Sequence, residues 1–153
     1  MTMEQIPRSF SVSLQITHPT LDPDEISKAT GLVPERTTRA GAARQTPQGD
    51  VLKGTYEFSC WTHQIDVTGA TELASVLQDL VERLSIHESF FHRVVAEGGA
   101  VELFCGVFAG GNWDEALSHA LMGRLSTLQI DLRLDVYPSD PSHGATGRLA
   151  TGK

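Results

Sequence analysis

The sequence predicts a small α+β domain, a two-layer sandwich with its helices packed on one face of a four- to five-stranded mixed or antiparallel sheet. Segments that alternate apolar and polar residues, as half-buried strands do, are interleaved with segments whose apolar residues recur at helical spacing. The first strand-like segment is rich in Ser on its polar side, and the last is rich in charged residues. One face of the sheet is therefore expected to be largely exposed, and the order of segments has ferredoxin-like character.

Length and composition fit one domain. The chain has 153 residues, of which 40% are hydrophobic and 20% charged, so it can bury a core without help from a metal or a disulfide. We expect the domain to span residues 1–137. Residues 138–153, rich in Pro, Ser and Gly, are expected to form a flexible tail.

The first strand and the helix after it have the clearest signals. Residues 9–17 alternate with period two, which predicts a strand with one buried face. A short helix follows, because Asp22 is a good N-cap, Pro23 suits the first helical position and Gly31 suits the left-handed residue beyond the helix end. Glu25, three residues after the cap, is expected to complete a capping box.

Residues 34–54 form a basic segment without apolar periodicity. Four basic residues against two acidic ones give it a charge of about +2, so the net charge of −7 leaves about −9 for the rest of the chain. We predict a single long loop, which is either functional or mobile.

A second strand is predicted over residues 56–67, with a bulge or turn at Thr62-His63. The chain has two cysteines, Cys60 in this strand and Cys105 in a later apolar one. A single pair is no disulfide framework, and free cysteine is among the most buried residue types. Both are therefore expected to be buried free thiols.

The second half of the chain predicts helices and strands in alternation. Residues 71–86 have an apolar stripe at helical spacing, and a second helical piece, residues 88–97, is expected after a kink. Residues 101–108 are apolar at nearly every position, which indicates a central strand. A further helix is expected to begin at Asn112 as N-cap. The last strand, residues 130–137, is expected to point its apolar residues inward and its charged residues outward.

No motif assembles a metal or catalytic centre. The six histidines lack ligand spacing on any regular element, and helix capping explains the carboxylates of residues 22–25. Residues 110–112 precede a predicted helix but match no phosphate-binding motif, and acidic residues beside them would repel an anion. Cys60 and His63 lie three apart along a strand, which places them on opposite faces. We therefore predict no catalytic residue, no metal and no cofactor.

The basic segment is the best candidate for a ligand site. Arg36, Arg39 and Arg44 are separated by small residues, and guanidinium groups bind carboxylates or phosphates bidentately. We expect His18 and Trp61 to meet this segment near one end of the sheet, so these five residues form the hypothetical ligand-binding site. The competing interpretation is a solvated loop that offsets an acidic body, with His18 bonded only to its own turn.

The net charge of −7 disfavours nucleic acid and anionic membrane surfaces as partners, because both are negatively charged. No apolar run approaches the ~18 residues of a membrane span, and the first ten residues have no apolar core of a signal peptide. We therefore expect a soluble cytoplasmic protein.

Several short motifs together resemble one bacterial family, catalogued as domain of unknown function 4279. They are the run ITHPTLDPDEISKATGLVPERTTRAG, Trp61, and the closing IDLRLDVYP. The resemblance covers about residues 10–137 and implies a small α+β bacterial domain. It implies no activity, cofactor or catalytic residue.

Two functions compete. A well-specified scaffold without a convergent catalytic set favours a non-enzymatic binding module that regulates or neutralises a protein partner. The alternative is a small anionic-ligand binder or an enzyme, with its site near His18, the Arg36–Arg44 segment and Trp61. Homodimerisation through the exposed face or an edge of the sheet is a third hypothesis.

Overall fold

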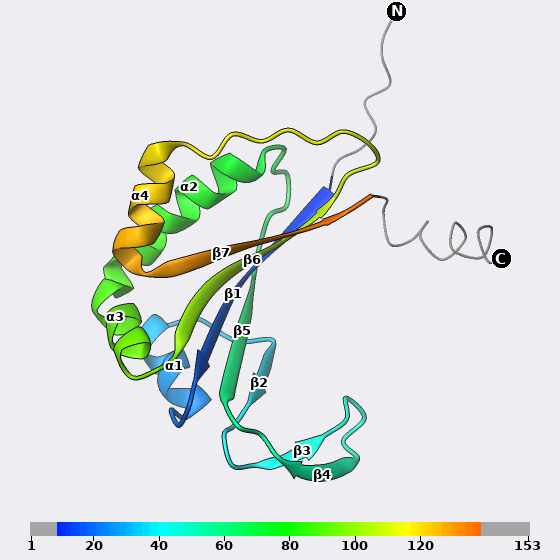
Figure 1. Cartoon of the computed structure of the whole chain (residues 1–153), viewed down its shortest axis with the longest axis vertical. Coiled ribbons are helices and arrows are strands. Elements are labelled where there is room, and N and C mark those ends of the chain that lie inside the picture. The colour runs from blue at the N-terminus through cyan, green and yellow to red at the C-terminus, as the bar shows by residue number, and fades with distance from the viewer. Residues whose placement is uncertain (1–8, 139–153) are drawn as a thin grey trace, which may run out of the picture.

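The computed structural model describes residues 9–138 and confirms the α+β class. Four α-helices and a short 3₁₀ turn cover one face of a five-stranded sheet, and a separate two-stranded hairpin projects from one end (Figure 1). The helical segments are α1 Pro23–Thr30, α2 Leu73–Leu84, η1 Ser85–His87, α3 Glu88–Ala96 and α4 His119–Leu128. The strands are β1 Ser9–His18, β2 Arg36–Thr38, β3 Ala43–Gln45, β4 Val51–Thr55, β5 Ser59–Ile65, β6 Ala100–Phe108 and β7 Ile130–Tyr137.

The sheet has the order β2-β5-β1-β6-β7, so β1 is its middle strand. It pairs antiparallel with β5 on one side and with β6 on the other. Strand β7 pairs parallel with β6, which makes the sheet mixed. A parallel pair requires a crossover connection, and the segment that contains α4 supplies it.

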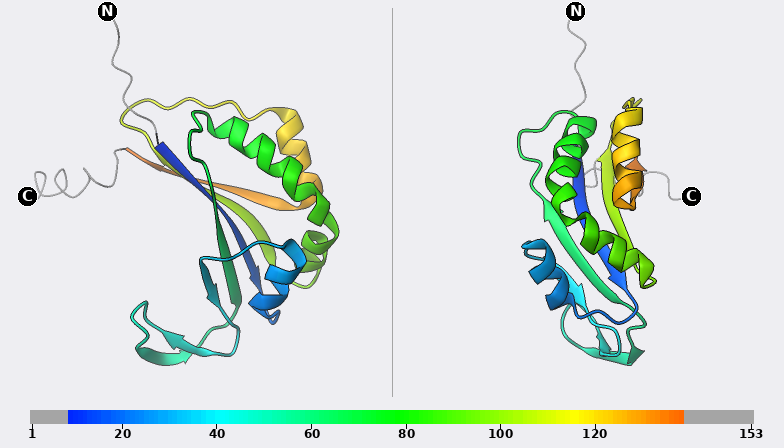
Figure 2. Two further views of the ribbon diagram at one scale, coloured as in Figure 1. Left: turned by 180° about the vertical axis from the view of Figure 1, so that it is seen from behind. Right: turned by 90° about the vertical axis from the view of Figure 1, so that its left-hand side faces the viewer.

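The helix side of β1 forms the centre of the core. Val12, Leu14 and Ile16 are all 0% exposed. Leu14 lies between His63 of β5 and Leu103 of β6, so its side chain is enclosed by neighbouring strands below the helices. Figure 2 shows the helices in front of this face of the sheet.

Helix α1 begins and ends as predicted. The Asp22 carboxylate accepts a hydrogen bond from the Asp24 N–H at 2.9 Å, Pro23 opens the helix, and Gly31 adopts a left-handed φ of 71°. The expected capping box differs, because the Glu25 carboxylate lies 3.7 Å from Lys28 of the next turn.

The prediction of one loop over residues 34–54 is wrong. Three short strands occur there: β2 extends the main sheet beside β5, and β3 pairs with β4 in the projecting hairpin. Every residue of β3 and β4 is exposed. Because such a hairpin buries no apolar side, it lacks the alternation by which strands are identified in a sequence.

Strand β5 has no bulge. Its pairing with β1 continues without a shift from Ser59 to Ile65, so the bulge predicted at Thr62-His63 is wrong. Strict alternation is enough to direct Trp61, His63 and Ile65 to the helix side.

Helices α2 and α3 match the prediction more closely. Helix α2 passes through the η1 turn into α3, which is the expected kink. The chain then returns to the sheet through Gly99, whose backbone packs tightly. A Cβ atom there would lie 2.4 Å from the Thr17 carbonyl oxygen and 3.0 Å from that of Val94.

Helix α4 begins later than predicted. Its N-cap is Ser118, whose hydroxyl accepts from the Leu121 N–H at 3.1 Å, and not Asn112. The residues before it run irregularly along the ends of the helices. Glu115, predicted inside a helix, accepts a hydrogen bond at 3.3 Å from the N–H of Ala74 in the first turn of α2. Its carboxylate therefore serves the start of a different helix.

Strand β7 has the predicted range but not the predicted burial. Ile130 is 5% exposed, whereas Leu134 and Val136 are 40% and 47% exposed. All three point to the helix side, but the helix cover ends along the strand. Leu134 and Val136 therefore face the predicted side of the sheet but are not buried there.

Within residues 9–138, no helix combines the length and apolar character needed to cross a membrane. The predicted tail from residue 138 onward lies, except for Pro138, outside the described residues.

Two glycine substitutions test this packing. Gly99→Ala should lower the free energy of unfolding by about 2–3 kcal/mol, because backbone oxygens cannot make room for the new methyl group. Gly123→Ala, inside α4 with nothing within 4 Å, should raise it by about 0.5–1 kcal/mol. Urea denaturation measures both. Equal effects at the two sites would contradict the close contact at Gly99.

Candidate functional site

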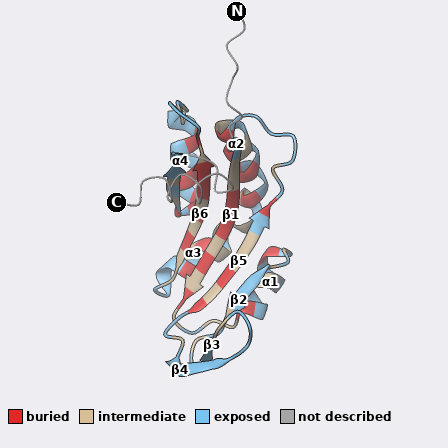
Figure 3. Cartoon of the chain, turned by 90° about the vertical axis from the view of Figure 1, so that its right-hand side faces the viewer, coloured by how far each residue is buried: buried red, intermediate tan, exposed pale blue. Residues whose placement is uncertain are grey.

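Within residues 9–138, no helix lies on the face of the sheet opposite α1 to α4 (Figure 3). Because strands alternate, the neighbours of the core residues on β1 point to this side. They are Ser11, Ser13, Gln15 and Thr17. Cys60 and Thr62 of β5 lie beside them, opposite Thr17 and Gln15. The face is therefore polar over β1 and β5, whereas over β6 it carries Phe104 and Phe108, opposite Ser13 and Ser9 of β1.

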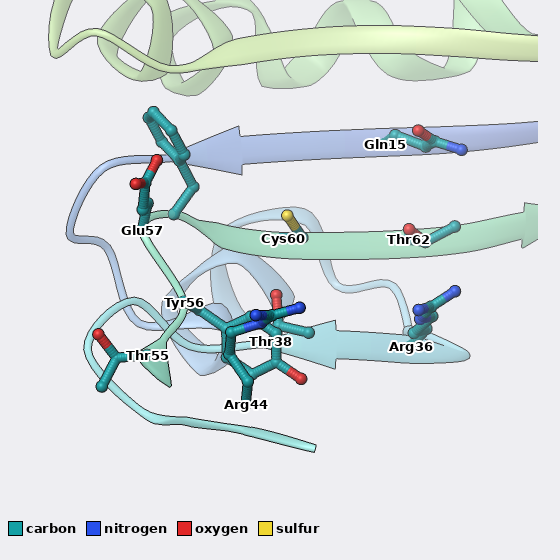
Figure 4. A pocket seen from close by; sticks show the side chains of 10 residues that line it. Gln15, Arg36, Thr38, Arg44, Thr55, Tyr56, Glu57, Cys60 and Thr62 are labelled. Carbon is teal, nitrogen blue, oxygen red and sulfur yellow. The ribbon is translucent and has the colours of Figure 1, made fainter. Parts of the chain in front are cut away.

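A cavity of about 620 Å³ opens on this face where the hairpin meets the sheet (Figure 4). Strands β1, β5 and β2 supply one part of its wall, and the hairpin with the segment that leads from it into β5 supplies the rest. Its lining residues are Gln15, Arg36, Thr38, Arg44, Thr55, Tyr56, Glu57, Phe58, Cys60 and Thr62.

Arg36 enters the cavity from β2. It lies opposite Thr62 in the strand pairing, on the same face as Thr38. Its side chain is exposed and makes no hydrogen bond or ion pair in the described part of the chain. A guanidinium in this state has all its donors available to a ligand.

Arg44 enters from β3, and bonds within the hairpin hold it in place. Its Nη1 donates to the Lys53 carbonyl oxygen at 3.3 Å, across the hairpin. The Tyr56 hydroxyl accepts from the Gln45 N–H at 3.1 Å, which ties the hairpin to the segment leading into β5. Arg44 therefore has a defined position beside Tyr56.

His18 lies elsewhere, buried on the helix side at the end of β1. Its Nδ1 accepts from the N–H groups of Thr20 and Leu21 at 3.0 and 2.9 Å. The ring proton is therefore on Nε2, which donates to the Glu97 carboxylate at 2.8 Å. All of these bonds fix the turn between β1 and α1.

Trp61 and Arg39 also have structural partners. Trp61 is fully buried on the helix side, and its Nε1 donates to the Ser27 hydroxyl of α1 at 3.0 Å. Arg39 lies 3.1 Å from Asp22 at the start of α1. Both hold α1 against the sheet.

The five predicted residues therefore do not gather into one site. Arg36 and Arg44 line the open-face cavity, whereas His18, Trp61 and Arg39 surround α1 on the other side. The other eight lining residues were not predicted from the sequence. The alternation of the strands indicates the face on which two of them lie. Gln15 and Thr62 fall on the polar side of their strands, opposite the side of Trp61.

The cavity is suited to polar binding. Two guanidinium groups and the carboxylate of Glu57 give its lining a net charge of +1, and hydroxyl groups of Thr and Tyr surround them. Phe58, 48% exposed, adds an apolar contact.

Cys60 lies in the cavity, but His63 points to the opposite face and bonds the Val33 carbonyl oxygen at 2.6 Å. The two do not form a nucleophile and base pair. Within residues 9–138, no group of three or more His, Cys, Asp or Glu side chains is placed to hold a metal ion.

The two cysteines differ in environment, which corrects the expectation of two buried thiols. Cys60 is only half-buried, on the open face. Cys105 is buried on the helix side, and burial raises the pKa of its thiol to about 12. Strand β1 lies between their strands.

The family model described as a domain of unknown function (DUF4279) matches residues 8–139. The chain belongs to this family. No curated protein and no solved structure matches it.

The His18–Glu97 bond predicts a dependence of stability on pH. Hydrogen bonds from His18 and Arg93 hold the pKa of the Glu97 carboxyl below its ordinary value of 4.5. The folded state therefore binds fewer protons than the unfolded state as this group titrates. Its contribution to stability is present above about pH 4.5 and is lost as the pH falls through the lowered pKa.

Glu97→Gln should therefore flatten the fall in the free energy of unfolding below pH 4.5. Asp79→Asn, on the exposed side of α2, is the matched control and should keep the wild-type slope. Urea titrations across that pH range measure the effect. Identical slopes for wild type and Glu97→Gln would show that the bond does not form.

Proposed function

We propose that this protein is a non-enzymatic binding module, and that an acidic segment of a protein partner binds in the open-face cavity. The single observation that carries the proposal is Arg36, an exposed arginine without a partner in the described part of the chain, at a cavity that a second arginine also lines.

The charge distribution supports an acidic ligand. The rest of the chain is acidic, and four of the seven arginines that the structure describes are paired with carboxylates, whereas Arg36 is not. Arg39, three residues after Arg36, lies on the helix side instead and is bonded to Asp22. Arg36 and Arg44 instead present their donors to the cavity, where a carboxylate can bind bidentately.

The shape supports an extended segment of chain. The cavity opens onto the sheet face, where Gln15 and Ser11 of β1 are half-buried and Ser13 between them is buried. Serine and glutamine side chains supply both donors and acceptors to a peptide backbone. Tyr56 and Phe58 offer aromatic contact at the mouth, and such residues are common anchors in protein interfaces.

A small anionic compound is the second candidate. The cavity has a volume of about 620 Å³, which lies in the range of small-molecule sites. Two arginines that line one cavity suit a carboxylate or phosphate group. Glu57 in the same lining would disfavour a compound of high negative charge.

We further propose that the module acts in a bacterial cytoplasm; the bacterial part of this proposal follows from the family that the short motifs resemble. Fractionation of the native host tests this placement.

Binding assays with two panels test the proposed site. Synthetic peptides containing Asp and Glu, and a set of small carboxylates and phosphates, are each titrated by calorimetry and by thermal shift. We expect at least one acidic peptide to bind, and Arg36→Ala to weaken it by about 10- to 100-fold because a charge-assisted hydrogen bond is lost. Arg44→Ala should have a similar effect.

Arg83→Ala, which removes an exposed arginine from α2, is the matched control and should bind as wild type does. Binding confined to the small anions would favour the second candidate. Binding that survives the Arg36 and Arg44 substitutions, or no binding in either panel, would contradict the proposed site.

A further inference from the structure

We propose that two copies of this chain associate through β7, which pairs antiparallel with β7 of the second copy about a twofold axis at Leu134. The two sheets would join into one continuous sheet. This surface is distinct from the open-face cavity, because β7 and β2 are the opposite edges of the sheet.

Strand β7 has an edge to which no strand of residues 9–138 is paired. Within these residues it pairs only with β6, although it is eight residues long and regular over its whole length. The opposite edge strand, β2, has three residues. An edge of this length presents a row of peptide N–H and C=O groups on its free side, and such a row favours pairing with another strand.

The apolar side of β7 is also uncovered. Leu134 and Val136 are 40% and 47% exposed, although their partners in β6, Cys105 and Val107, are fully buried. The apolar layer therefore extends past the helix cover to the free edge. A second β7 on this edge would bring apolar side chains against these two.

The charges on the other side of β7 are self-complementary. Asp131, Arg133 and Asp135 alternate in sign and all point to the open face. With a twofold axis at Leu134, each Arg133 lies opposite Asp135 of the second copy, twice per dimer. On the helix side the same register places Leu134 opposite Leu134 and Leu132 opposite Val136, so opposite charges meet on one face and apolar side chains meet on the other.

Neighbouring registers are worse. An axis at Arg133 places Arg133 opposite itself and Asp131 opposite Asp135, and an axis at Asp135 places that carboxylate opposite itself. Like charges directly opposite destabilise a strand pair. An axis at Leu132 pairs opposite charges but leaves Val136 without a partner. The Leu134 register alone satisfies both the charges and the exposed apolar residues.

Interactions already present within the chain are compatible with this register. Arg133 donates from Nε to Glu102 of β6 at 3.0 Å, which leaves its other guanidinium donors for Asp135 of the second copy. The two cavities would lie at the two far ends of the joined sheet and remain open.

Charge exchange tests the register. Sedimentation equilibrium and native mass spectrometry should show a dimer for the wild type. Arg133→Asp alone and Asp135→Arg alone should each weaken self-association by about tenfold or more, because each places like charges opposite. An equimolar mixture of the two variants should form a heterodimer, since every cross-strand pair is then again of opposite sign.

Leu134→Lys places two ammonium groups together on the axis and should also give a monomer. Ile86→Lys is the matched control, because Ile86 is 81% exposed in the η1 turn, outside β7, and should leave the dimer intact. A monomeric wild type would overturn the proposal. So would a dimer that Leu134→Lys leaves unchanged, or folded single-charge variants whose mixture fails to associate.

Discussion

The one-sided burial of β1 is the constraint on which the rest of the structure depends. This strand is the middle of the sheet, and its side chains alternate between a fully buried row, Val12 to Ile16, and a polar row that includes Gln15. A slip of one residue in its pairing would exchange the two rows, so the pattern fixes the register of β5 and β6 as well. The helices must then pack on one face, and the cavity must form on the other.

The parts of the fold that bury an apolar face could be predicted from the sequence. The β1 strand, the caps of α1 and the kink between α2 and α3 depend on local pattern, and the structure confirms them. The hairpin of β3 and β4 could not be predicted, because it buries nothing. The late start of α4 was missed for a related reason: Asn112 and Glu115 have suitable spacing for a cap, but Glu115 bonds the start of α2.

The candidate site was harder to predict than the fold. His18, Trp61 and the basic segment are close along the sheet, but the face on which each side chain lies depends on strand register. Arg36 and Arg39 illustrate this, since they are three residues apart and one faces the cavity while the other bonds Asp22 on the helix side. Only pairing between distant strands places Gln15, Thr62 and Arg44 together, and no local pattern encodes it.

Native thiol labelling tests the division between the two faces most directly. Cys60 lies half-buried in the cavity on the open face, and Cys105 lies fully buried on the helix side, where its pKa is raised to about 12. A thiol reagent added to the folded protein near neutral pH, followed by peptide mass spectrometry, should label Cys60 and leave Cys105 unmodified until the protein is denatured. Labelling of Cys105 at a rate comparable to that of Cys60 would contradict the two-faced sheet.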